Sequence, residues 1–276
     1  MSMRKAFVVG WPIAHSRSPL IHRFWLKRYQ IEGDYLAKAV PTDAIGDFLT
    51  GFGAKGYVGG NVTLPHKEAA FRLCAVTTPV ARRLEAANTL WQEEGRLHGD
   101  NTDVHGFTAN LDEGAPEWRQ GRTALVIGAG GASRAVLQAL IDAGYETAAL
   151  ANRTHARALE LEKHFGGPVA AFDLKALPEL IERADIIVNA TSAGLHDSAA
   201  LSVPWKRAKQ GAIVTDLIYV PLITPFLEEA RAEGMRIVDG LGMLLHQAVP
   251  GFERWFGLRP TIDAALRNYI LADLVR

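Results

Sequence analysis

The sequence has almost no cysteine and no excess of either charge. Its 276 residues include one cysteine, and Lys+Arg and Asp+Glu both number 30, so the formal net charge is zero. A single cysteine excludes an internal disulfide and fits a reducing, cytoplasmic setting. A neutral chain without a long run of one sign does not favour binding to nucleic acid or to a membrane surface. We therefore expect a small molecule as the partner. The sequence leaves monomer and homodimer open.

Long apolar runs are missing as well. No stretch reaches the roughly 20 apolar residues that a membrane-spanning helix requires. The first residues resemble a signal peptide, with Arg4 and Lys5 before an apolar run, but Gly10 and Pro12 interrupt that run and no cleavage site follows in register. The histidines show no spacing typical of metal ligands. We expect neither a membrane segment nor a metal.

What the sequence does contain is an alternation of short apolar runs with helix-like segments. In the first hundred residues, runs such as KAFVVG and YVGGNVTL alternate with helical patterns, which predicts an α/β unit with a mostly parallel sheet. NTLWQ and RLHGDN flank Glu94-Gly95, which indicates a hairpin. After the polar stretch 112–122, runs such as TALVI and ADIIVN predict a doubly wound, Rossmann-type nucleotide-binding sheet.

These patterns divide the chain into two α/β domains. We place the substrate-binding and catalytic domain at residues 1–114 and the nucleotide-binding domain at residues 115–239. The segment 240–276 has the pattern of two amphipathic helices with no strand after them. We expect these helices to pack back on the first domain and to complete it.

A glycine-rich turn joins the first strand of the second domain to a helix. Gly128, Gly130 and Gly131 follow TALVI directly, and the helix begins near Ser133. Glycines in such a turn let a pyrophosphate approach the backbone, and the helix N-terminus stabilises it with free N–H groups. The same residues could form a tight turn without a ligand, because a single glycine pattern is a weak signal.

The next strand ends in residues that favour NADP over NAD. Asn152, Arg153 and Thr154 lie about 24 residues after Gly128, where an NAD enzyme places an acidic residue for the ribose hydroxyls. Arg153 and Thr154, with Arg157 and Arg134, would hold an adenosine 2′-phosphate through charge-assisted hydrogen bonds. A solvated surface arginine is the alternative explanation of Arg153.

Polar side chains gather at the strand ends of the first domain, at the edge where open α/β sheets bind ligands. They are Ser16, Ser18, Asn61, Thr63, Lys67, Asn88 and Asp103. Hydroxyls, amides, one cation and one carboxylate suit a polyol that bears a carboxylate, because a site of this kind discriminates for each matching hydroxyl.

Helix capping is an alternative explanation for Ser18 and Asp103 but not for Lys67. Ser18 precedes Pro19 and would make a good helix N-cap, and Asp103 would equally cap the helix that follows it. Lys67 falls in the first turn of a helix that starts at Pro65, where the helix dipole disfavours a cation. We expect a functional site to be the reason for a lysine at this position.

Ordered motifs extend along essentially the whole chain. They are HSRSP (15–19), NVTLPHK (61–67), ANTL (87–90), GDNTD (99–103), GAGGASR (128–134), NRT (152–154), NATSAG (189–194), DLIYVPLITPFL (216–227) and DGLGMLLHQA (239–248). Through these motifs the chain resembles the shikimate dehydrogenase family. The resemblance implies an enzyme of aromatic amino-acid and chorismate biosynthesis that interconverts shikimate and 3-dehydroshikimate with NADP(H).

The resemblance also implies roles for individual residues. Ser16, Ser18 and the Tyr219 hydroxyl would lie near the substrate carboxylate, and Asn61, Thr63, Asn88 and Gln247 would contact the ring hydroxyls. Packing on Pro221 and solvation are the alternatives for Tyr219 and Gln247. The expected cofactor contacts are Gly128, Ala129, Gly130, Gly131, Ala132, Ser133, Arg134, Asn152, Arg153, Thr154, Arg157, Thr191, Ser192, Leu217, Gly240 and Met243. Trp11, Ala86 and Leu195 depart from the family pattern at positions without a chemical role.

Lys67 and Asp103 are the candidates for proton transfer. Oxidation of a secondary alcohol needs a group that removes the hydroxyl proton as hydride leaves the same carbon. Our hypothesis is that Lys67 is the general acid/base and that Asp103 orients both Lys67 and the hydroxyl. If Lys67 only anchors the substrate, its loss raises KM and leaves kcat unchanged. A quinate/shikimate enzyme of relaxed specificity and a non-catalytic NADP-binding sensor are the alternative functions.

Overall fold

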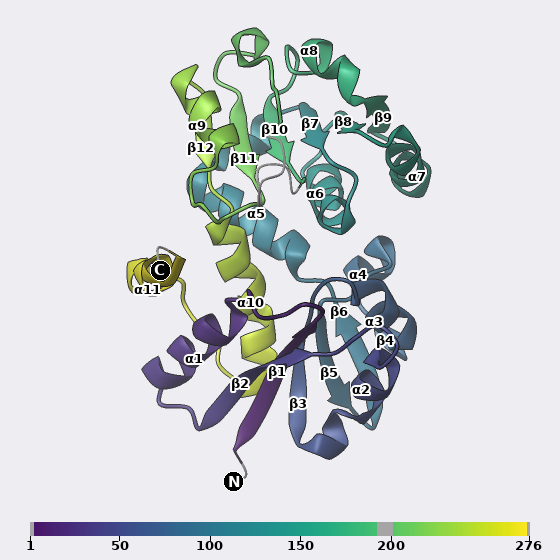
Figure 1. Ribbon diagram of the computed structural model, residues 1–276, viewed down its shortest axis with the longest axis vertical. Coiled ribbons are helices and arrows are strands. Elements are labelled where there is room, and N and C mark those ends of the chain that lie inside the picture. Colours follow the sequence, from purple (N-terminus) through teal and green to yellow (C-terminus); the bar gives the residue numbers. More distant parts are fainter. Residues whose placement is uncertain (1–2, 192–200, 275–276) are drawn as a thin grey trace. The chain divides into compact units, whose positions relative to one another are not determined.

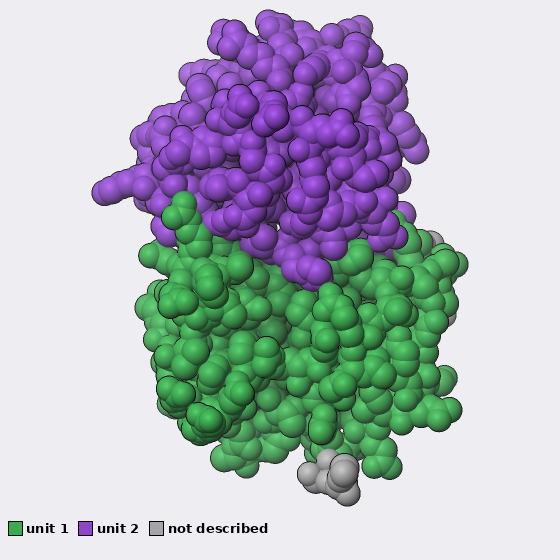
Figure 2. Space-filling view, turned by 180° about the vertical axis from the view of Figure 1, so that it is seen from behind, with its two compact units in different colours: residues 1–103, 245–276 green, residues 104–244 purple. Residues whose placement is uncertain are grey.

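The computed structural model describes residues 3–191 and 201–274. The chain divides into two compact units, Met1–Asp103 with Leu245–Arg276, and Val104–Leu244, which Figure 2 shows in different colours. Each unit is built on its own six-stranded sheet. This confirms the predicted α/β class with two sheets. The predicted domain boundaries at residues 115 and 240 stay a prediction, because compact units need not coincide with binding domains.

Unit 1 contains a mixed sheet in the order β2-β1-β3-β5-β6-β4 (Figure 1). The strands β1, β2 and β3 are parallel, and β5 runs antiparallel to both of its neighbours, β3 and β6. Residues Glu94 and Gly95 turn the chain between β5 and β6, both with positive φ, so the predicted hairpin is confirmed. The strands are β1 (Arg4–Gly10), β2 (Gly33–Ala39), β3 (Tyr57–Val62), β4 (Val76–Thr77), β5 (Thr89–Glu93) and β6 (Arg96–Asp100).

Helices cover both faces of this sheet. On one face, Ile45 and Leu49 of α2 and Ala70 of α3 pack on Phe7 and Val9 of β1. On the other face, aromatic side chains of α1 and α10 surround β2. The predicted return of the C-terminal helices is confirmed, because α11 packs against α1. The helices are α1 (Ser18–Arg28), α2 (Ile45–Gly51), α3 (Lys67–Leu73), α4 (Pro79–Leu84), α10 (Leu241–Phe256) and α11 (Ala264–Leu274).

A glycine in β3 allows α10 to approach the sheet closely. A Cβ atom at Gly59 would lie 2.3 Å from both the main-chain oxygen of Leu90 and Nε1 of Trp255. Trp255 uses the space to donate a hydrogen bond of 2.9 Å to that same oxygen. Any larger residue at position 59 would push the indole ring away from the sheet.

Unit 2 contains a fully parallel sheet in the order β12-β11-β10-β7-β8-β9. In chain order this is the 3-2-1-4-5-6 arrangement of doubly wound nucleotide-binding folds, and the strand order reverses between β7 and β10. The strands are β7 (Thr123–Ile127), β8 (Thr147–Asn152), β9 (Val169–Asp173), β10 (Ile186–Asn189), β11 (Ile213–Asp216) and β12 (Arg236–Val238).

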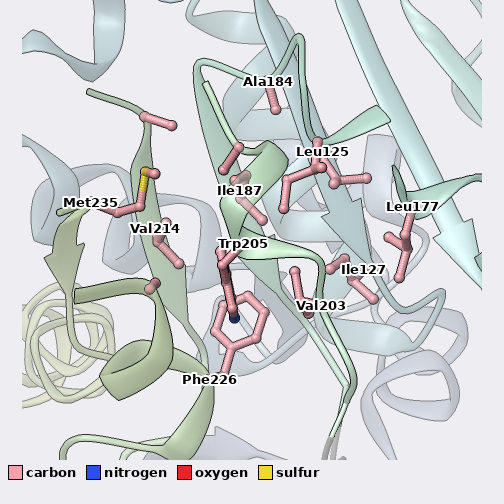
Figure 3. Close-up of a cluster of buried hydrophobic side chains, with 14 of the residues drawn as sticks. Leu125, Ile127, Leu177, Ala184, Ile187, Val203, Trp205, Val214, Phe226 and Met235 are labelled. Atoms are coloured by element: carbon pink, nitrogen blue, oxygen red, sulfur yellow. The ribbon is translucent and has the colours of Figure 1, made fainter. Parts of the chain in front are cut away.

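The strands of unit 2 are apolar on both faces, as expected of a parallel sheet between helices. On one face, Leu125, Ile187 and Val214 from three neighbouring strands pack against Trp205 and Phe226 (Figure 3). The helices of this unit are α5 (Asp103–Gly114), α6 (Gly131–Asp142), α7 (His155–Phe165), α8 (Leu177–Leu180) and α9 (Pro225–Ala232). No helix in the described part of the chain is long and apolar enough to cross a membrane.

Candidate active site

The strand directions of unit 1 bring its polar residues to one edge of the sheet. The carboxyl ends of β1, β3 and β6 meet there with the amino end of β5, because β5 is antiparallel to its neighbours. In the register, Asn61 pairs with Thr89, and Thr89 pairs with Asp100. Asn88, just before β5, therefore lies between the segment that follows β3 and the segment that follows β6.

Lys67 and Asp103 form an ion pair at this edge. The distance from Nζ of Lys67 to Oδ2 of Asp103 is 2.5 Å, and the two side chains are 22% and 11% exposed. Lys67 is the first residue of α3, where the helix dipole opposes a positive charge. The Asp103 carboxylate offsets this unfavourable field, because the attraction between opposite charges is stronger in a partly buried site than in water.

Asn88 donates a hydrogen bond to the other oxygen of the same carboxylate. Its Nδ2 donates to Oδ1 of Asp103 at 2.8 Å, and its own Oδ1 accepts from the main-chain N–H of Thr102 at 2.8 Å. Because a main-chain N–H can only donate, this contact defines which end of the Asn88 amide faces Asp103. Both carboxylate oxygens of Asp103 thus contact side chains, which favours a site role over simple helix capping.

Asn61 lies deeper in the sheet than its predicted role suggests. It is 5% exposed, and its Nδ2 donates to the main-chain oxygen of Asn88 at 3.0 Å and to Oγ1 of Thr89 at 3.1 Å. Its Oδ1 accepts from the Tyr35 hydroxyl at 2.6 Å. Contact with a ring hydroxyl stays a prediction, and only the second lone pair of Oδ1 is left for it.

Ser16 lies just before α1, and Ser18 is the first residue of that helix. Ser16 and Ser18 lie together, since Oγ of Ser16 accepts from the main-chain N–H of Ser18 at 3.4 Å. The N-cap position of α1 is Arg17 and not Ser18, so the capping explanation of Ser18 is not what the structure shows. Arg17 in turn forms an ion pair with Asp273 of α11 at 2.6 Å, which ties the loop to the C-terminal helix.

Thr63 and Gln247 border the same edge from β3 and α10. Thr63 follows β3, and its N–H donates to the main-chain oxygen of Val9. The main-chain oxygen of Gln247 accepts from Oγ1 of Thr102 at 2.8 Å, which anchors α10 beside Asn88. The predicted contacts of Thr63 and Gln247 with substrate hydroxyls stay predictions.

Asn101 and Thr102 are site residues that the sequence analysis did not single out. Asn101 accepts from the Asp103 N–H through Oδ1 and donates through Nδ2 to the main-chain oxygen of Ala86. Ala86 contributes only a main-chain atom, so its departure from the family pattern leaves this contact intact. Both missed residues belong to the motif GDNTD, whose polar character was the available signal.

In unit 2 the glycine loop has the geometry of a dinucleotide site. Gly128 has φ +107°, and a Cβ atom there would lie 2.7 Å from Cγ2 of Thr191, so only glycine fits. Oγ of Ser133 donates to the main-chain oxygen of Gly128 at 2.6 Å and accepts from the Gly130 N–H at 3.1 Å. Apart from adjacent residues and the backbone of α6 itself, no atom of the described residues lies within 4 Å of a Cβ atom at Gly130 or Gly131. The loop therefore has room for a pyrophosphate at the N-terminus of α6.

The residues predicted for the 2′-phosphate lie at the end of the neighbouring strand. Oδ1 of Asn152 accepts from the Ala129 N–H at 3.2 Å, which joins this strand end to the glycine loop. Thr154 is the N-cap of α7, and Arg153 and Arg157 are exposed. Within residues 3–191 and 201–274, no ion pair neutralises either arginine. These cations fit a phosphate, and Arg134 lies on the first turn of α6.

A buried carboxylate organises the other cofactor-side segments. Asp216 accepts hydrogen bonds from Nδ2 of Asn189 and from Oγ1 of Thr224, and burial raises its pKa. Oδ1 of Asn189 in turn accepts from the N–H and the hydroxyl of Thr191. These contacts were not predicted. They hold Thr191 at the end of β10 and the predicted contact Leu217 at the end of β11, whose N–H donates to the main-chain oxygen of Asn189.

Of the remaining positions singled out in the sequence, the structure explains the residue type only at Gly240. A Cβ atom at Gly240 would lie 2.6 Å from the main-chain oxygen of Asp216, so glycine permits a close approach of two segments. Tyr219 and Met243 are half-buried in unit 2, and their predicted contacts stay predictions. Ser192 and Leu195 lie outside the described residues.

Comparison with known proteins identifies the family. Models of the shikimate dehydrogenase substrate binding domain, of shikimate / quinate 5-dehydrogenase and of the shikimate 5′-dehydrogenase C-terminal domain match residues 8–90, 114–229 and 240–267. The shikimate dehydrogenase (NADP(+)) of Bartonella henselae is 52% identical over 275 residues, which cover 98% of this chain and 94% of that protein.

Solved structures agree with this match. The shikimate 5-dehydrogenase of Thermus thermophilus, solved with NADP(H) and shikimate, is 40% identical with a TM-score of 0.86, over 99% of this chain and 100% of that one. The quinate dehydrogenase of Corynebacterium glutamicum, solved with NAD, is 28% identical with a TM-score of 0.88, over 97% and 98% of the two chains. With its motifs, both sheets and these matches in agreement, the chain belongs to the shikimate dehydrogenase family.

Proposed function

We propose that this chain is an NADP-dependent oxidoreductase that interconverts shikimate and 3-dehydroshikimate by hydride transfer at a CH–OH group. The observation that carries the proposal is the ion pair of Lys67 and Asp103 at the ligand-binding edge of unit 1. A proton donor and a carboxylate beside several amides and hydroxyls suit an alcohol substrate better than an apolar one.

Lys67 donates the proton in the reduction and accepts it in the oxidation. NADP, when bound, supplies the hydride chemistry at its nicotinamide ring. Reduction of the ketone adds a proton to the carbonyl oxygen, and an ammonium paired with Asp103 is the form that donates it. Oxidation of the alcohol runs the same step in reverse. Asp103 holds the Lys67 ammonium through Oδ2, and Asn88 fixes the carboxylate through Oδ1.

The other residues bind and orient. Ser16, Ser18 and Tyr219 hold the substrate carboxylate, while Asn61, Thr63, Asn88 and Gln247 meet the ring hydroxyls. Charge-assisted bonds from Arg153 and Arg157 hold the 2′-phosphate, and the open glycine loop receives the pyrophosphate. The remaining assigned cofactor contacts are Ala129, Gly130, Gly131, Ala132, Ser133, Arg134, Asn152, Thr154, Thr191, Ser192, Leu217, Gly240 and Met243.

A steady-state assay tests the function. Shikimate should reduce NADP, and the rate with quinate or with NAD should be much lower. Activity on quinate equal to that on shikimate would indicate the relaxed-specificity enzyme, and cofactor binding without turnover would indicate a sensor. The identity of 52% with an NADP-dependent shikimate enzyme, against 28% with the quinate enzyme, does not favour these alternatives.

The proposals for the cellular location and the oligomeric state of the protein rest on fewer observations. A single cysteine fits the cytoplasm, where an enzyme of aromatic amino-acid biosynthesis meets its substrates. Burial raises the pKa of the Cys74 thiol to about 12, which supports a structural role for it. Monomer and homodimer are both retained, and sedimentation of the purified chain distinguishes them.

A further inference from the structure

The Asn61 amide has one orientation, and the Tyr35 hydroxyl supports it. Nδ2 of Asn61 donates to the main-chain oxygen of Asn88, which can only accept, so Oδ1 must face the other way. There it meets the hydroxyl of Tyr35 at 2.6 Å, and that hydroxyl must be the donor. Tyr35 is fully buried on β2, far along the chain from the catalytic motifs.

His22 holds the Tyr35 ring in place. The two rings are stacked with centroids 3.9 Å apart and an angle of 7° between their planes. Trp25, Phe252 and Trp255 enclose the pair. Burial lowers the pKa of His22 to about 3, so the imidazole is neutral, and burial raises the pKa of Tyr35 well above its usual value. Neither nitrogen of His22 makes a hydrogen bond of normal geometry, although the nearby Asn61 side chain opposes part of its pKa shift.

The contacts continue from Asn61 to the ion pair. Asn61 holds the main chain of Asn88, and the side chain of Asn88 holds Oδ1 of Asp103. Each of these groups is buried, so none of the bonds is easily replaced by water. A change at Tyr35 therefore reaches Asp103 through two intermediate residues.

We propose that Tyr35, supported by His22, is a positioning residue for the reaction. By fixing the Asn61 amide it aligns Asn88 and, through it, the carboxylate that holds Lys67. This inference rests on the proposed function, since it assigns Tyr35 to the same site.

The test compares two tyrosines with matched hydrogen bonds. Tyr145 of unit 2 is also buried, and its hydroxyl donates to the main-chain oxygen of Trp118 at 2.6 Å. Tyr35→Phe and Tyr145→Phe each remove one buried bond, so both should lower Tm by a few degrees, about 2–4 °C. Only Tyr35→Phe should lower kcat, by about tenfold, with the KM for NADP unchanged. Equal kcat losses in both variants, or no loss in Tyr35→Phe, would overturn the proposal.

A double-mutant cycle tests whether Tyr35 acts through Asn61. If it does, adding Tyr35→Phe to Asn61→Ala lowers kcat little further, so the two effects are not additive. Fully additive losses would show an independent route and contradict the proposal. Wild-type turnover of shikimate in the same assay tests the proposed function separately. Without turnover the proposed function fails, and the role of Tyr35 fails with it. Turnover that Tyr35→Phe leaves unchanged overturns only the role of Tyr35.

Discussion

Asn88 donates a hydrogen bond of 2.8 Å to Asp103, on the carboxylate oxygen that Lys67 does not contact. The carboxylate is thereby held at both oxygens and cannot rotate without losing one partner. This two-sided restraint fixes where the Lys67 ammonium lies relative to the sheet edge. It also leads to distinct predictions for Lys67 and for Asn88.

Replacing Lys67 by alanine should abolish most turnover. Loss of a general acid/base lowers kcat by about a hundredfold to ten-thousandfold, and the KM for shikimate should change little. Lys209→Ala is a control, because Lys209 also pairs with an aspartate, Asp185, which lies at the amino end of β7, whereas the assigned cofactor residues follow the carboxyl ends of the strands. A raised KM with normal kcat in Lys67→Ala would show that the lysine only anchors the substrate.

Substitutions of Asn88 should separate the loss of a donor from the addition of a charge. Asn88→Ala leaves Oδ1 of Asp103 without this donor, which costs about 1–3 kcal/mol of stability and lowers kcat. Asn88→Asp has nearly the same shape but sets a second carboxylate against Asp103, so kcat should fall further. Urea unfolding and initial rates measure both effects. If Asn88→Asp were as active as Asn88→Ala, Asn88 would not be the partner of a charged Asp103.

Removal of the Arg153 side chain should weaken NADP binding selectively. A charge-assisted hydrogen bond contributes about 1.5–3 kcal/mol, so the Kd for NADP should rise by about tenfold to a hundredfold, while the Kd for NAD stays constant. Isothermal titration of the free enzyme measures this without turnover. Arg231→Ala is the control, because Arg231 is an exposed arginine of the same unit that pairs with Glu228. An unchanged Kd for NADP would refute the contact with the 2′-phosphate.

Acid should destabilise unit 1 through His22. Its pKa is about 3 in the folded chain and 6.5 when exposed, so only the unfolded chain gains a proton between these values. Its contribution to stability is complete above pH 6.5 and falls as the pH decreases, by about 1.4 kcal/mol per pH unit. By about pH 5 the loss is about 2 kcal/mol.

His22→Phe keeps an aromatic ring against Tyr35 but cannot bind a proton. Denaturant unfolding of wild type and variant over this pH range should show a flatter dependence for the variant. Parallel curves for the two proteins would mean that His22 is not buried in the neutral form.

The parts of the fold that follow from local patterns could be predicted from the sequence. The alternation of strands and helices, the turn at Glu94 and Gly95, and the glycine loop after β7 depend on neighbouring residues. A functional role for Lys67 could be predicted because a lysine in the first turn of a helix is locally unfavourable. Such conflicts between residue and local structure are visible without coordinates.

The supporting contacts could not be predicted, because they join residues distant in the chain. Tyr35 on β2 and Asn61 on β3 meet only when both strands pair with β1. Likewise Asp216 reaches Asn189 through the parallel pairing of β10 with β11. Buried polar side chains of this kind look like ordinary strand residues in a sequence, since their partners are set by sheet register.

The discontinuity of unit 1 has a consequence for synthesis. Its first part ends at Asp103, and its second begins only at Leu245, after the whole of unit 2. Trp255, which fills the space beside Gly59, therefore leaves the ribosome only after the whole of unit 2. Because chains fold domain by domain from the N-terminus, unit 1 begins to form first but is completed only after unit 2. Until α10 arrives, Phe252 and Trp255 cannot cover His22 and Tyr35, although Lys67 and Asp103 have already been synthesised.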